Sequence, residues 1–571
     1  MQDFNRARSK SFVAQAAILS VSSFAVKIIG VLSKIPLANI LGDGMGIFNA
    51  AYSIYAMLFM ISTSGLPVAI SRMIAASAEK GRLTETKKIL RMSIYAFGIV
   101  GVLCSLFLFI FAESIAVWSI HPDSMLAMKV IAPTLFFICI ASAFRGYFQG
   151  LRNMYPTAIS QFVEAFIKLS VGLGATIWAR HMEYPIQVQA AFAISGVTLG
   201  VFLGMLYLVL YNMYSKRTHF REKSEASIRY KKIARNLVII AFPVTITSSA
   251  LYLSQFLDTL VINKVLVGNG LPFITAEALF TAYTTLAISI SDLLPATLVY
   301  PIAISILPAV AGALALKKRK EAAGYIISSI RISGIIALPS SICLFVLARP
   351  CIALIYGAGW GSEITLASGR TVMPIDIGAP ALRILALGIF FISLLSTTNA
   401  LLQAVGKVYY PLVSVGVGVA VLIIAEIGLI SIEAIGIYGA PISSVLCYSV
   451  ALYLNMHFLR KTQRIKLPPK RLFLKPFAAA AVTGIYSLAS YRLIYYLWSI
   501  AFKSSPDGRA ASFVILLLTA AGGVLLYAFV LLAIKGVVAK EIRLLPKGDS
   551  ICNFLIKKGW IKNTGVVNNE Q

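Results

Sequence analysis

The chain carries about fourteen apolar runs, each long enough for the roughly twenty residues that a helix needs to cross a bilayer. They lie at 11–41, 47–70, 92–111, 125–144, 157–178, 188–211, 237–261, 276–310, 322–347, 381–403, 411–430, 437–458, 476–498 and 510–534. Runs this long do not fit the alternating strands of an outer-membrane barrel. Because hydrophobic residues make up 58% of the sequence, we predict an all-α polytopic membrane protein.

Lysine and arginine gather in every second connection between these runs. The connections at 72–91, 216–235 and 460–475 are basic, whereas those at 113–124 and 431–436 are not. The positive-inside rule therefore predicts that both termini lie in the cytoplasm. We assign the net charge of +29 to this orientation and to anionic lipid head groups, not to nucleic acid.

An internal repeat relates the two halves of the chain. FFICIASAFRGYFQ at 136–149 aligns without a gap on FFISLLSTTNALLQ at 390–403, and PVAIS at 67–71 matches PIAIS at 301–305. Each pair falls at the same place in a six-helix count, which indicates two parallel-repeat lobes. We predict an N-terminal lobe at 1–215, a basic cytoplasmic linker at 216–236, a C-terminal lobe at 237–460, two further helices at 461–534 and a basic cytoplasmic tail at 535–571.

Two lysines interrupt the first apolar run. Lys27 and Lys34 share one helical face with Ser20, Ser23 and Gly30. An ammonium at bilayer depth costs roughly 2.5 to 3.5 kcal/mol on insertion scales, so we expect both to face a water-filled cavity that suits an anionic substrate. The alternatives are that a lysine snorkels to an interface or pairs with a carboxylate on a neighbouring helix.

Other charged residues extend this candidate site. The further candidates for substrate binding are Arg72, Arg145, Arg152 and Lys264. The default role of the two arginines at 145 and 152 is topological anchoring. Glu164 and Lys168 stand one helical turn apart in the fifth run, so we expect them to pair with each other.

The remaining candidates concern gating and ion coupling. Prolines and serines near the cytoplasmic ends of the second and eighth runs, where a proline permits a bend, are the gating candidates Pro67, Ser71, Pro301 and Ser305. A merely tolerated kink is the alternative. In the seventh run, Gln255, Asp258 and Asn263 are candidates for ion coupling, and for Asp258 a pairing with a cavity lysine ranks first. Asp292 and Glu426 make the second lobe more acidic than the first.

The sequence predicts no cofactor and no metal. The six cysteines show no CxxC spacing and no histidine at metal spacing, and a P-loop is absent from the sequence. The expected driving force for transport is therefore a monovalent cation gradient or the membrane potential.

Three segments resemble a known family: GDGMG at 42–46, GLPVAISR at 65–72 and RGYFQGLRNMYPTAISQFVEAFIKL at 145–169. They resemble the polysaccharide flippases of the multidrug/oligosaccharidyl-lipid/polysaccharide exporter superfamily. Within it the chain is most similar to the branch of lipid II flippases (MurJ) and stage V sporulation protein B. The resemblance implies a MATE-like V of two six-helix lobes, a cationic cavity in the first lobe for the lipid pyrophosphate, and a groove beside helices 13 and 14 for the polyprenyl tail.

The resemblance also bears on single residues. Lys27 falls where the family carries a cavity cation in its first helix. Ser33 stands where the family carries an arginine, with Lys34 beside it, and the eighth run lacks the expected cavity arginine.

The function implied is a flippase, not an enzyme. It would move an undecaprenyl-pyrophosphate-linked glycan, with lipid II as first choice, to the outer leaflet of a bacterial cell membrane. The alternatives are a flippase for a teichoic, capsular or spore-specific lipid precursor, a drug/cation antiporter of the same fold, a polyprenyl-dependent glycosyltransferase, and a non-transporting scaffold. The expected partners are the lipid-linked anionic substrate, membrane lipids and the cell-wall synthesis machinery.

Overall fold

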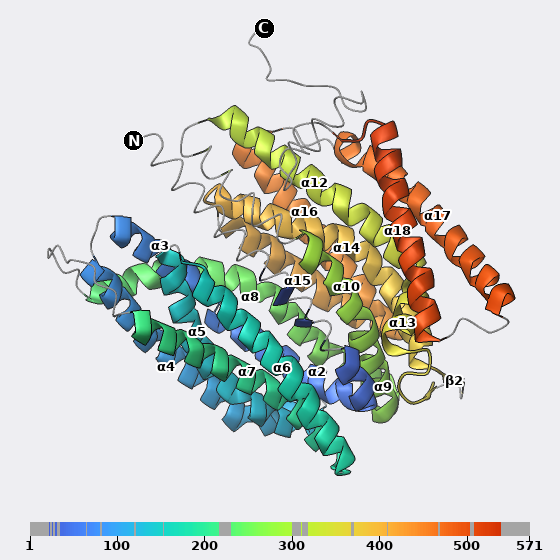
Figure 1. The fold of residues 1–571 in the computed structure, drawn as a ribbon, viewed down its shortest axis with the longest axis horizontal. Helices are drawn as coiled ribbons and strands as arrows, with labels where there is room; N and C mark the ends of the chain where they lie inside the picture. The colour runs from blue at the N-terminus through green and yellow to red at the C-terminus, as the bar shows by residue number, and fades with distance from the viewer. Residues whose placement is uncertain are drawn as a thin grey trace, which may run out of the picture. The chain divides into compact units, whose positions relative to one another are not determined.

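The computed structural model describes the central part of the chain with several gaps. The described residues are 22, 25–26, 29–30, 33, 35–63, 65–79, 83–118, 121–151, 153–215, 230–299, 310, 314, 318–366, 370–407, 409–465, 469–502 and 508–537. Helices account for nearly all of them (Figure 1). They divide into two compact units, 1–285 with 360–374 and 419–440, and 286–359 with 375–418 and 441–571.

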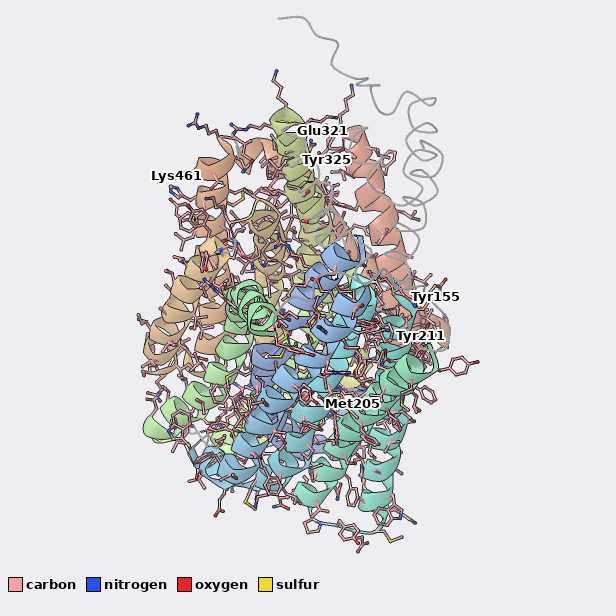
Figure 2. All side chains as sticks on the ribbon, turned by 90° about the vertical axis from the view of Figure 1, so that its left-hand side faces the viewer. Tyr155, Met205, Tyr211, Glu321, Tyr325 and Lys461 are labelled. Atoms are coloured by element: carbon pink, nitrogen blue, oxygen red, sulfur yellow. The ribbon has the colours of Figure 1, made fainter. Side chains whose placement is uncertain are left out.

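The first unit is a bundle of long helices. Its elements are η1 (Gly42–Gly44), α2 (Met45–Thr63), α3 (Leu66–Glu79), α4 (Leu83–Trp118), η2 (Pro122–Ser124), α5 (Met125–Gly150), α6 (Tyr155–His181), α7 (Ile186–Ser215), α8 (Tyr230–Gly268), α9 (Phe273–Ala282), β1 (Ile364–Thr365), β2 (Thr371–Val372) and η5 (Gly436–Tyr438). Figure 1 shows α4, α5, α6 and α7 side by side, in agreement with their contacts. Figure 2 shows that Tyr155, which begins α6, and Tyr211 near the end of α7 lie at the same end of this bundle.

Small residues bring α6 and α7 into close contact. A Cβ placed on Gly196 of α7 would collide with the backbone of Gly172 in α6, and one on Gly200 would lie 2.6 Å from the carbonyl oxygen of Glu164. Small residues at such interfaces let membrane helices pack backbone to backbone. This packing fixes the rotation of α6 and therefore the directions of its polar side chains.

The second unit contains the remaining helices. They are α10 (Ser289–Leu294), the π-helical turn η4 (Pro295–Val299), α12 (Arg319–Val346), α13 (Ala348–Tyr356), α14 (Pro374–Ala404), α16 (Gly439–Gln463), α17 (Pro469–Phe502) and α18 (Arg509–Ala533). A further π-helical turn, η3 (Tyr283–Ile288), and α15 (Tyr409–Ile430) each run from one unit into the other. In Figure 2, Glu321 and Tyr325 at the start of α12 and Lys461 near the end of α16 lie at the same end, as the predicted alternation of basic connections requires.

The predicted membrane fold is confirmed. Within the described residues, 11 helices are long and apolar enough to cross a membrane, and each overlaps one predicted run. The other predicted runs are 11–41, which lies partly outside the described residues, 47–70 and 237–261. The total number of crossings and the bounds of the two predicted lobes remain predictions.

The predicted run at 47–70 is not one continuous helix. In the described residues α2 ends at Thr63, and α3 begins at Leu66 with Pro67 in its first turn. A proline fits this position because the amide that it lacks has no partner within the helix there. Between the two helices, a Cβ on Gly65 would lie 2.8 Å from the backbone nitrogen of Thr245 in α8. The chain therefore breaks at a glycine that allows α8 to approach.

The repeated segments adopt the same local structure. Residues 136–149 end α5 just before its terminal Gly150, and residues 390–403 end α14 just before Ala404. In both cases a short turn follows, and the next helix begins with a Tyr-Pro pair in its first residues. This equivalence supports the internal repeat, although PIAIS at 301–305 lies outside the described residues.

Candidate functional site

Several predicted site residues lie outside the described residues. They are Lys27, Lys34, Arg152, Pro301 and Ser305. Gln255 occupies α8, but its side chain is not described. The candidate site is therefore built from the charged and polar side chains that the structure describes.

Arg145 and Glu164 form an ion pair between α5 and α6. Arg145 Nη2 donates to Glu164 Oε2 at 2.8 Å, and Arg145 Nε donates to Ser160 Oγ at 3.2 Å. The side chains are 12% and 27% exposed, so this pair lies largely within the protein. The planar guanidinium can reach both partners at once, whereas an ammonium has no such fork.

The predicted pairing of Glu164 with Lys168 is wrong. Glu164 is bonded to Arg145, and Lys168 Nζ instead lies 4.9 Å from the ring centroid of Tyr52. Sequence spacing identifies neighbours along one helix, but it contains no information about an arginine presented by an adjacent helix. Tyr52 belongs to a row of aromatic rings on α2 that also includes Phe48 and Tyr55.

The other cationic candidates do not gather around Arg145. Arg72 is exposed on α3. Lys264, near the end of α8, is exposed with its ammonium 4.3 Å from the ring centroid of Trp118, the last residue of α4. This contact is a cation–π interaction at the end of the bundle where α5 begins, whereas Arg145 lies near the opposite end of α5.

The two described gating candidates are packed against glycines. A Cβ on Gly146 of α5 would lie 2.9 Å from the carbonyl oxygen of Pro67, and one on Gly150 would lie 2.8 Å from that of Ser71. The first turns of α3 therefore rest directly on the backbone of α5. Any bend at this point has to slide α3 along the glycines of the RGYFQG segment.

The first unit also contains a pair of buried carboxylates and, further along α8, a buried amide. Asp258 of α8 is 7% exposed and interacts electrostatically with Glu426 of α15, which is 1% exposed. Asn263 Nδ2 lies 3.1 Å from Nε2 of His121, whose ring packs on Phe280. Asp258 and Glu426 fall within the range predicted for the C-terminal lobe, 237–460, but their contacts place both in the first compact unit.

Several of these buried side-chain oxygens lack hydrogen bonds within the described structure. They are Oδ1 of Asp258, both carboxylate oxygens of Glu426 and Oδ1 of Asn263. A buried carboxylate without a donor is unfavourable unless it takes up a proton or a cation. Glu426 is a described neighbour of Asp258, and the predicted pairing of Asp258 with a cavity lysine stays a prediction because Lys27 and Lys34 lie outside the described residues. The described residues contain no group of three or more His, Cys, Asp or Glu side chains arranged to hold a metal ion.

An apolar groove lies in the second unit between α12, α14 and α17. It encloses about 470 Å³ and is lined by Leu338, Ser341, Ile342, Leu387, Phe390, Phe391, Phe473, Leu474 and Phe477. α17 is the thirteenth predicted run, one of the two beside which the family resemblance implies a groove for a polyprenyl tail, and no described residue of α18, the fourteenth, lines this groove. Phe390 and Phe391 come from the repeated FF segment.

Comparison with known proteins identifies the family. The family model described as "Polysaccharide biosynthesis protein" matches residues 12–314. Three proteins of Bacillus subtilis are similar over almost their whole length. The uncharacterized membrane protein YabM is 26% identical, covering 95% of this chain and 96% of its own. Stage V sporulation protein B is 25% identical over 94% and 98%, and the lipid II flippase MurJ is 22% identical over 90% and 93%.

Solved structures show the same fold. An inward closed conformation of the lipid II flippase MurJ superposes with a TM-score of 0.60 at 14% identity, covering 90% of this chain and 98% of that one. An inward-facing MATE family multidrug transporter of the MOP superfamily gives a TM-score of 0.58 at 15% identity, covering 78% and 98%. The relatives and solved structures above whose names state an activity are flippases and transporters. The chain belongs to the polysaccharide biosynthesis protein family, as a multi-pass membrane protein that shares its fold with the lipid II flippase MurJ and with a MATE transporter.

Proposed function

We propose that the protein is a flippase that moves an undecaprenyl-pyrophosphate-linked glycan, with lipid II as first choice, from the inner to the outer leaflet. The observation that carries this proposal is the apolar groove beside α17. In addition, the solved MurJ structure aligns with 90% of this chain, whereas the MATE structure aligns with 78%. A drug antiporter has no need of a groove for a long polyprenyl chain. The protein would work by alternating access in a bacterial cell membrane, with both termini in the cytoplasm.

The groove has the character that a polyprenyl tail requires. Its lining consists of aliphatic and aromatic side chains with the single hydroxyl of Ser341, which already donates to the carbonyl oxygen of Ala386 at 2.6 Å. Apolar sites of this kind bind through the area that they remove from water or lipid head groups. The pyrophosphate would be held by cations of the first unit, with Lys27 and Lys34 as the sequence candidates.

Asp258 and Glu426 support the proposal that transport is coupled to a monovalent cation. Two buried carboxylates that interact with each other offer hard oxygen ligands, and their mutual repulsion falls when a proton or cation binds. We extend the proposed coupling set of Asp258, Gln255 and Asn263 by Glu426. Pro67 and Ser71, with the break at Gly65, are the proposed cytoplasmic gate.

A second cargo is favoured by a specific observation. Stage V sporulation protein B matches with higher identity and coverage than MurJ, 25% over 94% of this chain against 22% over 90%. We therefore keep a spore-specific, teichoic or capsular lipid precursor as the alternative. Association with the cell-wall synthesis machinery is part of the same proposal.

The test is transport of labelled lipids by the purified full-length protein in lipid vesicles, together with rescue of a strain depleted of its lipid II flippase. Lipid II should become accessible on the far leaflet, and growth should be restored. Parallel vesicles with a teichoic precursor identify the second cargo. A correctly inserted protein that moves neither lipid and rescues no growth would refute the proposal.

A further inference from the structure

We infer that Lys168 of α6 is a phosphate-binding residue in the interior of the first unit. This inference rests on the proposed function, since it assigns a role toward the anionic head group of the same cargo. Three features support this inference: the depth of Lys168, the pairing of the charges around Lys168 and the course of the first helix beside α6.

Lys168 lies at the middle of its helix. It is thirteen residues from Tyr155 at one end of α6 and thirteen from His181 at the other. At 1.5 Å per residue, both ends are about 20 Å away. A crossing helix of this length places its centre near the middle of the hydrocarbon layer, where Lys168 cannot reach either interface by snorkelling.

The charge of Lys168 is not neutralised by the nearest acid on its own helix. Glu164 is bonded to Arg145, whose other donor reaches Ser160, so this network is electrically balanced. Lys168 is only partly buried and contacts the face of Tyr52 at 4.9 Å. A cation–π contact stabilises an ammonium without cancelling its charge. Lys168 is therefore a cation in the interior that no described carboxylate pairs with. Because a charge at bilayer depth is unfavourable, its presence there indicates a function.

The first helix runs alongside α6 and reaches the same depth. Ser22 Oγ donates to the carbonyl oxygen of Ala158 at 3.2 Å near the start of α6, and Arg180 Nη1 near its end donates to the carbonyl oxygen of Ile40 at 2.8 Å. Residue 30 lies about midway between these two contacts, as Lys168 does on α6. Among the described residues, no atom lies within 4 Å of a Cβ placed on Gly30. Within the described residues, Gly30 therefore has open space beside it at about the depth of Lys168.

Lysine and tyrosine together suit a phosphate. An ammonium binds phosphate oxygens as a compact point charge with several donors, and it can turn from the ring of Tyr52 toward a stronger anion. The ring of Tyr52 then remains as one wall of the site. In this arrangement Tyr52 contacts the Lys168 ammonium when no substrate is bound. The Arg145–Glu164 ion pair stabilises the position of α6, the helix that carries Lys168.

The experiment compares Lys168→Met and Lys168→Arg with the wild type, and with Lys461→Met as the matched control. Lys461 is an exposed lysine near the end of α16, outside every proposed site (Figure 2). The first readout is the shift in thermal unfolding midpoint caused by undecaprenyl pyrophosphate, with uncharged undecaprenol as the reference lipid. The second is translocation of labelled lipid II in vesicles.

The expected result is that Lys168→Met loses the pyrophosphate-dependent shift and translocates about tenfold more slowly or worse, because a charge-assisted phosphate contact is removed. Lys168→Arg and Lys461→Met should keep both. The unfolding midpoint without lipid should change little in all variants, which separates phosphate binding from a structural role. If Lys168→Met does not fold, Lys168→Gln replaces it in the same comparison.

The outcomes separate this inference from the proposed function. A wild type that is stabilised by undecaprenyl pyrophosphate, beside a Lys168→Met or Lys168→Gln variant that is stabilised equally, overturns the assignment of Lys168 alone. A wild type that responds to neither lipid overturns the proposed function, and the assignment falls with it. A wild type that binds undecaprenyl pyrophosphate but does not move lipid II retains the assignment and changes the cargo.

Discussion

The two units treat polar groups in their interiors differently. The first unit holds charges of both signs away from its surface: the Arg145–Glu164 pair and Lys168 are partly buried, and the carboxylates Asp258 and Glu426 are fully buried. Among the described residues of the second unit, the fully buried polar side chains are neutral, as in the 2.7 Å hydrogen bonds between the Ser333 and Thr397 hydroxyls and between the side-chain amides of Asn455 and Asn399. Arg331 of this unit is only partly buried and donates from Nη2 to the carbonyl oxygen of Gly536 at 2.7 Å.

This difference matches the two chemical halves of a lipid-linked substrate. Charges inside a membrane protein are unfavourable and persist where they are paired or where they serve a ligand, whereas neutral hydrogen bonds only hold helices together. The unit with buried charges suits a phosphate head group and a coupling ion. The unit with neutral contacts carries the apolar groove and suits the tail.

The largest effect should come from breaking the ion pair of the first unit. Arg145→Met leaves Glu164 without its guanidinium, and we expect a loss of about 3 kcal/mol in the free energy of unfolding, the lower end for buried pairs because Glu164 keeps 27% exposure. The double variant Arg145→Met with Glu164→Leu should recover most of this loss. Unfolding of the purified variants in mixed detergent micelles measures both.

The neutral network of the second unit provides the contrast. Replacing Ser333 and Thr397 by alanine and valine removes both partners of a buried hydrogen bond, so we expect a change below about 1 kcal/mol. A loss as large as that of Arg145→Met would contradict the distinction between the units.

The next effect concerns ion coupling. Asp258→Asn or Glu426→Gln removes one of the two interacting carboxylates, and each should abolish the dependence of lipid transport on the cation gradient. We expect the gradient-driven rate to fall about tenfold or more, equivalent to about 1.4 kcal/mol or more. Transport in vesicles with and without a sodium or proton gradient is the measurement. Asp376→Asn is the control, because Asp376 pairs with Arg349 at 2.9 Å in an exposed part of the second unit. Equal gradient dependence in all three variants would remove Asp258 and Glu426 from the coupling site.

A smaller effect is expected from filling the groove of the second unit. Leu387→Trp places a large ring in the groove. For each methylene of the lipid tail that the ring displaces, the apparent affinity for a long-chain polyprenyl lipid should fall about fourfold. A short-chain analogue that does not reach the groove should be transported normally. Ile485→Trp is the matched control, since Ile485 is a 72% exposed residue of α17 that does not line the groove. The same loss with both chain lengths would show that the groove does not hold the tail.

The sequence is sufficient for the parts of this structure that depend on local pattern. The spans follow from hydropathy, and the equivalence of 136–149 with 390–403 follows from alignment within the chain. The sequence could not predict that Glu164 bonds to Arg145, because the i,i+4 rule offered Lys168 as an equally good partner. The sequence also could not predict that Glu426 interacts with Asp258, because that interaction depends on how helices far apart in the sequence pack.

The smallest effect should come from a hairpin that joins the first unit although helices of the second unit flank it in the sequence. Residues 360–374 belong to the first unit, where the Trp360 indole Nε1 donates to the carbonyl oxygen of Ala38 at 2.8 Å and Ser362 Oγ donates to Asp43 Oδ2 at 2.6 Å. Trp360→Phe keeps most of the apolar contact but removes one buried donor, so we expect a local cost of about 1 kcal/mol. Hydrogen exchange of residues 360–374 should then accelerate about fivefold, while exchange in α14 stays unchanged. Faster exchange in both segments would mean that the hairpin and the second unit open together, and the two units could no longer be treated as independent in their response to mutation.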